Sequence, residues 1–173
     1  IVHGQPPKKI KNGTEVARYA YDPAGRRVER VVGGTATTYT YDSEDTLRER
    51  EGTIARTYVH GPGVDEPVAA ERGTELSYFH ADALGSIVKM SDPSGRVNLT
   101  RQYDAWGGLE EGAEQPGYAY TGREWDPEGQ LYYYRARAYD PAGGRFVSED
   151  PVRLRGGINL YASHDIAVDD VTV

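Results

Sequence analysis

The stretch ARYAYDPAGRRVERV, residues 17–31, contains the pattern on which the fold of this chain depends. Apolar and polar residues alternate on both sides of a central Asp-Pro-Ala-Gly, as they do in two half-buried strands joined by a turn. In such a turn the aspartate accepts backbone hydrogen bonds, the proline fixes φ at the next position, and the glycine accepts a positive φ. The stretch is therefore predicted to form a β-hairpin.

The same unit recurs along the chain at a spacing of about twenty residues, which is typical of a repeat protein. Paired aromatic residues mark it, at Tyr19 and Tyr21, Tyr39 and Tyr41, Tyr58 and His60, and Tyr78 and His80. Turns of the form Asp-x-x-Gly begin at Asp22, Asp82, Asp92, Asp104, Asp126 and Asp140, and Asp42 has Asp45 in the glycine position, where we expect a left-handed backbone. A single hairpin cannot bury its apolar face, so we expect neighbouring hairpins to lie side by side.

No long stretch holds a helical period, so the sequence predicts an all-β fold of tandem antiparallel hairpins in a curved or spiralling sheet. A sheet of this kind either curls or leaves open edges. Open edges invite pairing with more chain, and they make self-association through edge strands an expected property.

Composition excludes several classes of function. The chain has 173 residues with 20 basic and 27 acidic side chains, and the formal charge of −7 makes nucleic acid an unexpected partner. It has no cysteine, which removes disulfides, thiol nucleophiles and cysteine-ligated zinc. No apolar run approaches the roughly 18 residues of a membrane span. The start, IVHGQPPKK, has neither a methionine nor a signal-like segment, so we expect a fragment of a longer protein.

The apolar residues are unusual in kind, with 14 Tyr against 2 Phe and 2 Trp. Tyrosine suits a pleated surface on which the ring packs and the hydroxyl reaches water or a polar partner.

Four further stretches carry a family resemblance: YFHADALGSIVKMSDPSGRV (78–97), QYDAWG (102–107), YAYTGREWDPEGQLYYYRARAYDPAGGRFVSEDP (118–151) and GGINLYA (156–162). Together with the tandem YxYDxxG units, this ordered series resembles the YD-repeat or Rhs family, at the C-terminal end of its conserved core. The match runs from about residue 17 to residue 162.

The resemblance implies a spiralling sheet that, in full-length members, forms a hollow shell around a toxic polypeptide. The segment similar to 118–162 then acts as a plug that turns inward. On this basis the chain divides into an N-terminal extension (1–16), YD hairpins (17–117), the plug (118–162) and an atypical tail (163–173). The implied partners are the rest of the same shell and a C-terminal toxin, and the implied location is secreted or at the bacterial cell surface.

Many members of this family also cut themselves beyond the plug by an aspartic-protease-like reaction, which needs two carboxylates that share one proton. The first carboxylate corresponds here to Asp150, although Arg153 replaces the expected glycine of its motif. A second Asp-Pro motif with a scissile leucine is expected near Thr172, and the tail SHDIAVDDVTV contains no such motif. Asp170, or Asp165 or Asp169, would supply the second carboxylate only in a shifted register. Whether the chain is an enzyme is left open, and Asp150 is also interpreted as an ordinary turn residue.

Other candidate sites are weaker. His60 and His80 would lie side by side if their strands were in register, but no third ligand stands at a recognisable spacing, so neither a metal nor a cofactor is expected. Arg135, Arg137 and Arg145 alternate along a strand. They either pair with acids of neighbouring hairpins, namely Glu124, Glu128, Asp140 or Glu149, or they form a polar inner wall.

Three functions follow from these observations. The first is a structural segment of a secreted polymorphic toxin that encapsulates a C-terminal toxic polypeptide. The second is a self-cleaving segment that releases this polypeptide. The third is a cell-surface module that binds carbohydrate or a partner through exposed tyrosine rings.

Overall fold

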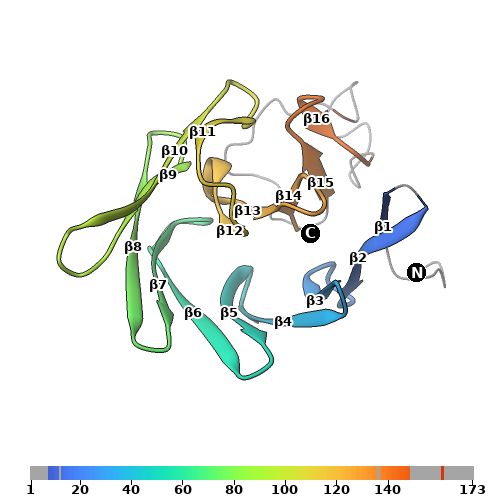
Figure 1. The fold of residues 1–173 in the computed structure, drawn as a ribbon, viewed down its shortest axis with the longest axis horizontal. Coiled ribbons are helices and arrows are strands. Elements are labelled where there is room, and N and C mark those ends of the chain that lie inside the picture. The colour runs from blue at the N-terminus through green and yellow to red at the C-terminus, as the bar shows by residue number, and fades with distance from the viewer. Residues whose placement is uncertain (1–7, 12, 136, 149–160, 162–173) are drawn as a thin grey trace.

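The computed structural model describes residues 8–11, 13–135, 137–148 and 161, which form antiparallel β-strands and one short 3-10 helix. Figure 1 shows a large curved sheet that bends around a smaller sheet on its concave side. The prediction of an all-β fold, in which tandem hairpins form a curved sheet and a later segment turns inward, is confirmed. In the described part of the chain, no helix has the length and apolarity needed to cross a membrane.

We call the larger sheet the wall. Its eleven strands lie in chain order, and each pairs antiparallel with the next. The first strand of each hairpin begins at residue 14, 35, 54, 75 or 97, which confirms the repeat of about twenty residues. The strands are β1 (Lys8–Lys11), β2 (Thr14–Tyr21), β3 (Arg27–Val32), β4 (Thr35–Asp42), β5 (Asp45–Glu51), β6 (Ile54–His60), β7 (Pro67–Arg72), β8 (Glu75–Ala81), β9 (Ile87–Ser91), β10 (Val97–Tyr103) and β11 (Leu109–Gly112).

The regular turns of the wall have the predicted chemistry. Asp22 Oδ1 accepts the backbone N–H groups of Ala24 and Arg26 at 3.0 and 2.9 Å, and Gly25 has φ +84°. The turns that begin at Asp82, Asp92 and Asp104 repeat this arrangement. Each of these turns is therefore stabilised by its own aspartate.

Three turns differ from the prediction. In the β4–β5 turn the left-handed residue is Ser43, at φ +55°, and the prediction for Asp45 was wrong because Asp45 already pairs with Asp42 as a strand residue. In the turns after Asp126 and Asp140 the positive φ falls one residue later than predicted, at Gln130 and Gly144. The reason is that both aspartates are the last paired residues of their strands rather than the first residues of the turn.

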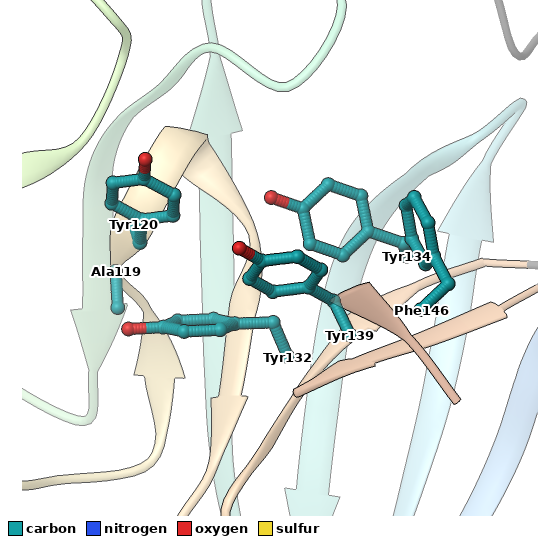
Figure 2. Packing of buried hydrophobic residues seen from close by; sticks show 6 residues of the cluster. All are labelled: Ala119, Tyr120, Tyr132, Tyr134, Tyr139 and Phe146. Atoms are coloured by element: carbon teal, nitrogen blue, oxygen red, sulfur yellow. The ribbon is translucent and has the colours of Figure 1, made fainter. Parts of the chain in front are cut away.

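We call the smaller sheet the inner sheet, and it contains most of the buried aromatic side chains. A cluster of rings lies along it, with Tyr139 fully buried and Tyr134 and Phe146 packed edge to face at 5.4 Å (Figure 2). Aromatic side chains each bury about 150–250 Å², so this cluster is the main hydrophobic core. The strands are β12 (Gly117–Tyr118), β13 (Glu124–Asp126), β14 (Leu131–Tyr134), β15 (Arg137–Asp140) and β16 (Arg145–Phe146), and the 3-10 helix is Tyr120–Gly122.

Candidate functional site

The candidate site is the interface between the concave face of the wall and the inner sheet. Tyrosine hydroxyls of the wall reach across it, as where Tyr19 donates to Asp126 Oδ2 at 2.6 Å. On the next hairpin, Tyr41 donates to the carbonyl oxygen of Arg27 at 2.8 Å, a bond within the wall. Farther along, His60 Nε2 of the wall lies 3.0 Å from the hydroxyl of Tyr118 in the inner sheet. Two of the repeated aromatic positions, Tyr19 and His60, therefore bond the inner sheet directly.

Arg27 of the wall forms the most buried ion pair of this interface. Its guanidinium bonds Glu124 of β13, and Thr46 donates to the other oxygen of that carboxylate at 2.7 Å. The guanidinium also lies between the rings of Tyr39 and Tyr133, at 4.5 Å from each centroid. Burial lowers the pKa of Arg27, but the nearby Tyr39 and Glu124 outweigh burial and raise it above its ordinary value. Arg27 is therefore charged at neutral pH.

Arg30 extends this contact to a second and a third acid. Its guanidinium bonds Glu128 and lies 3.4 Å from Asp126. Burial raises the pKa of Asp126, but Arg30, the Tyr19 hydroxyl and the N–H of Gly129 together hold it below its ordinary value. We call Arg27 and Arg30 with Glu124, Asp126 and Glu128 the wall-arginine cluster.

A second cluster has the opposite polarity, with acids on the wall and arginines on the inner sheet. Asp65, in the loop between β6 and β7, binds Arg123 at 2.7 Å and Arg135 at 2.8 Å. Asp45 and Glu44 of the β4–β5 turn lie 3.7 and 3.5 Å from Arg135. Burial raises the pKa of Asp65, although the two guanidinium groups oppose this. We call these five residues the wall-acid cluster.

The wall-acid cluster is built on unusual backbone geometry. Asp65, Thr121 and Arg135 have φ values of +57°, +48° and +49°, in the left-handed region that side chains other than glycine rarely adopt. At Gly122 a Cβ atom would overlap the carbonyl oxygen of Asp65. The two sheets therefore approach each other at the backbone here, and strained residues are kept in place by the ion pairs around them.

Three tyrosines of the inner sheet bind one turn of the wall. The hydroxyls of Tyr120, Tyr139 and Tyr132 donate to the consecutive carbonyl oxygens of residues 105, 106 and 107, at 3.0, 3.0 and 2.7 Å. Figure 2 shows the rings of Tyr120, Tyr132 and Tyr139 next to one another in the cluster. Tyr132 of the tyrosine-rich stretch 132–134 therefore packs in the hydrophobic core with its ring and binds the wall with its hydroxyl.

Arg101 stabilises the segment that connects the wall to the inner sheet. Its guanidinium donates to the carbonyl oxygens of Ala113, Gln115 and Tyr118, at 3.1, 3.0 and 2.9 Å. Next to it, Gly112 has φ +105°, and a Cβ atom there would overlap the carbonyl oxygen of residue 100. One buried guanidinium thus satisfies three carbonyl groups of the connection.

The two predicted catalytic carboxylates, Asp150 and Asp170, lie outside the described residues. The nearest described positions are Ser148 before Asp150 and Tyr161 after it. The N–H of Phe146, in β16, donates to the carbonyl oxygen of Tyr161 at 3.2 Å. The end of the inner sheet therefore contacts the chain beyond Asp150.

The arginine prediction is wrong for Arg135, because its acidic partners come from the wall rather than from neighbouring hairpins. Likewise Glu124 and Glu128 pair with wall arginines. Sequence reasoning missed Asp65 and Arg27. The available signal was the loop GPGVDE (61–66), the one turn between the early repeats that has neither Asp-x-x-Gly nor a two-residue form.

His60 and His80 are not brought together. His60 faces the inner sheet and contacts Tyr118, whereas His80 bonds Ser91 Oγ at 2.8 Å. In that strand Phe79 takes the inward position instead, and its ring lies 6.3 Å from that of Tyr118. Among the residues that the structure describes, no group of three or more His, Cys, Asp and Glu side chains is arranged to hold a metal ion.

Comparison with models of protein families finds no match, but several curated proteins are similar in sequence. The tRNA nuclease WapA of Bacillus subtilis is 33% identical over 145 residues, which cover 78% of this chain and 6% of that protein. The toxin protein Tse5 of Pseudomonas aeruginosa is 30% identical over 192 residues, which cover 87% of this chain and 14% of that protein. The double-stranded DNA deaminase toxin A of Burkholderia cenocepacia is 28% identical over 185 residues, 86% of this chain and 13% of that protein. The chain thus spans a small part of each relative.

Solved structures of toxin complexes have a similar fold. The TcdB2-TccC3 structure without the hypervariable C-terminal region matches 90% of this chain and 9% of its own, with a TM-score of 0.64 and 24% identity. The TcdB2-TccC3-Cdc42 structure matches 94% of this chain and 9% of its own, with a TM-score of 0.68 and 24% identity. The Tc holotoxin pore of Photorhabdus luminescens matches 90% of this chain and 8% of its own, with a TM-score of 0.63 and 23% identity. The chain is therefore similar in sequence to these toxins and has the fold found in the TcdB2-TccC3 structures. The sequence likenesses support an Rhs-type family for it.

Proposed function

We propose that this chain is a structural segment of an exported toxin. In this proposal the wall is an arc of a larger shell, the inner sheet closes that arc from inside, and the shell encloses a toxic polypeptide that follows in the longer protein. Its relatives include the toxin protein Tse5 and two proteins that differ in activity, a tRNA nuclease and a double-stranded DNA deaminase toxin. A scaffold common to such proteins has a role independent of any one activity.

The observation that carries the proposal is the way in which the wall curves around the inner sheet. Hairpins from β2 to β11 contact the inner sheet through bonds of Tyr19, Arg27, Asp65 and Arg101 and through the carbonyls of the Asp104 turn. These bonds fix the inner sheet on the concave side. Because these bonds are structural contacts between the two sheets, they support a role in containment rather than in catalysis.

Limited proteolysis of the full-length product of the gene tests this function. We expect the polypeptide downstream of residue 173 to survive trypsin for much longer within the whole protein than when it is produced alone. Disruption of the wall-arginine cluster by Glu124→Ala is expected to shorten this survival, because the inner sheet then loses its most buried ion pair. Arg50→Gln, a change at an exposed position of β5, is the matched control.

Equal digestion rates for the enclosed and the isolated polypeptide, with the wall still intact on the gel, would contradict containment. Shortened survival in the Arg50→Gln control would show that protection depends on general stability rather than on the interface.

Self-cleavage by Asp150 with Asp170 remains the second proposal. It is supported by the contact between Phe146 and Tyr161, which joins the end of the inner sheet to the chain beyond Asp150. Mass spectrometry of the purified chain after incubation at several pH values tests it. Loss of a defined C-terminal peptide that Asp150→Ala or Asp170→Ala abolishes would support cleavage, and an unchanged mass would reject it.

Carbohydrate binding through tyrosine rings has less structural support. Most of the 14 tyrosines lie at least partly between the two sheets, and the exposed ones are Tyr21, Tyr78 and Tyr161, at about two fifths exposure. Saturable retention on a polysaccharide that Tyr78→Ala abolishes would restore this interpretation.

A further inference from the structure

A row of charged side chains crosses the concave face of the wall beside the inner sheet. The strand registers place Glu49 opposite Arg56, Arg56 opposite Arg72, and Arg72 opposite Glu75. The row thus has two arginines at its centre and one glutamate at each end. Like charges that lie directly opposite each other on adjacent strands are destabilising unless an anion lies between them.

The two arginines differ in their contacts. Arg56 donates to Glu49 Oε1 at 2.8 Å. Burial raises the pKa of Glu49, although Arg56 opposes this. Burial lowers the pKa of Arg56, but the nearby Tyr58 and Glu49 outweigh burial and raise it above its ordinary value. The side chain of Arg72 is exposed, and its guanidinium has neither an ion pair nor a hydrogen bond within the part of the chain that the structure describes. Its cross-strand neighbour Glu75 is exposed too and lies beyond ion-pair distance. The centre of the row therefore has one uncompensated guanidinium.

This centre lies where two pockets meet. One pocket of about 230 Å³ extends toward β4 and Trp125, and another of about 300 Å³ extends toward β8 and β10. Both are lined by Arg56, Arg72 and the connection at Pro116 and Gly117. Together they form a groove between the wall and the start of the inner sheet.

The two pockets of this groove have different linings. The second has apolar side chains at Phe79, Met90 and Leu99, whereas the first combines Ile54 and Trp125 with charged side chains that include members of the wall-arginine cluster. Gly117 lies next to Arg56, since a Cβ atom built on it would be in ordinary contact with Arg56 Nη1, at 3.8 Å. The groove therefore has guanidinium groups at its centre and some apolar side chains on both sides of them. A planar guanidinium binds a carboxylate through paired hydrogen bonds.

We propose that Arg56 and Arg72 form a carboxylate-binding site for an extended polypeptide segment in which an acidic side chain stands between apolar ones. This inference rests on the proposed function, since the enclosed polypeptide of the longer protein is the natural source of such a segment. Five acids line the same groove: Glu49, Glu51, Glu75, Glu124 and Asp126. Three of them are already paired with arginines, Glu49 with Arg56, Glu124 with Arg27 and Asp126 with Arg30. Glu51 and Glu75 would attract a basic side chain, so the preference for an acidic one comes from Arg72 beside Arg56 at the centre.

Fluorescence anisotropy with the 173-residue chain tests the site. The probes are three labelled pentapeptides, Leu-Val-Glu-Val-Leu and the same sequence with Gln or Lys in the middle. We expect the Glu peptide to bind at least about tenfold more tightly than the Gln peptide, which corresponds to about 1.4 kcal/mol. Arg72→Gln is expected to remove this preference, and since Arg72 is exposed, the variant is expected to keep the wild-type melting temperature.

The matched control is Arg50→Gln, which removes the same charge from an exposed position of β5 outside the groove. It is expected to leave the preference unchanged. Equal affinity for the Glu and Gln peptides, no measurable binding of any peptide, or an Arg72→Gln variant that still prefers Glu would each overturn the site.

The failure of this site is distinguishable from the failure of the proposed function. Protease protection in the full-length protein together with no peptide preference would retain containment and reject the carboxylate site. A peptide preference without protection would retain the site and reject containment.

Discussion

The two charged clusters hold the inner sheet with opposite polarity. In the wall-arginine cluster, cations of the wall bind acids of the inner sheet, whereas in the wall-acid cluster, Asp65 and its neighbours bind Arg123 and Arg135. If the inner sheet were turned end for end, its acids would face the acids of the wall and its arginines would face the arginines of the wall. The difference shows that the arrangement of charges, and not only the amount of apolar contact, favours one orientation of the inner sheet over the reverse one.

The largest effect is expected from breaking the wall-arginine cluster with Glu124→Ala. The side chains of Arg27 and Glu124 are 5% and 11% exposed, so the substitution leaves a buried guanidinium without its counter-charge. Removing one partner of such a pair costs about 3–5 kcal/mol of unfolding free energy. Urea denaturation followed by circular dichroism measures this loss.

A double variant, Arg27→Met with Glu124→Leu, is the control for this first prediction. It removes both charges and replaces them with apolar groups of similar volume, so most of the lost stability is expected to return. A double variant as unstable as Glu124→Ala would show that shape, rather than the uncompensated charge, caused the loss.

A smaller effect is expected from Asp65→Asn in the wall-acid cluster. The amide keeps one acceptor but loses the charge that two arginines share, and hydrogen bonds to charged groups contribute about 1.5–3 kcal/mol. The same urea measurement applies. Glu66→Gln, at the exposed neighbouring position, is the matched control. A loss for Asp65→Asn larger than that for Glu124→Ala would reverse the ranking of the two clusters.

The pH dependence sharpens the comparison at Asp126. Its pKa in the folded chain is below the ordinary value, so its contribution to stability is complete above the unfolded pKa of about 3.9 and is lost as pH falls through the lower folded pKa. The difference in unfolding free energy between the wild type and Asp126→Asn is therefore expected to shrink below pH 4. A difference that stays constant between pH 7 and pH 2 would show that Asp126 contributes through shape alone.

The smallest effect is expected at a regular turn. Asp92 caps only its own turn, and its pKa is lowered by the hydroxyl and the N–H of Ser94 and by the N–H of Arg96. Asp92→Ala is expected to lower the melting temperature by less than Asp65→Asn does, because no contact with the inner sheet is lost. A larger decrease would show that regular turns stabilise the wall more than the irregular ones do.

Local features were predictable because they depend on neighbours in sequence. The Asp-x-x-Gly turns and the alternating strands specify hairpins, and hairpins in series specify the order of strands in the wall. The predicted left-handed residue was wrong in two turns, where the positive φ lies at Ser43 and at Gln130, because the strands pair in a register that the turn pattern does not predict. Register depends on packing across the strands, which local turn chemistry does not include.

The sequence by itself therefore determined an all-β chain of repeated hairpins, its aromatic ladder and its resemblance to the Rhs family. Only the tertiary structure showed that Arg27 meets Glu124 and that Asp65 meets Arg135, across 97 and 70 residues of chain. Turn chemistry acts over four or five residues and leaves a local pattern. An ion pair between two sheets depends on how far the wall curves, and that curvature is the sum of many small strand twists that no single stretch of sequence specifies.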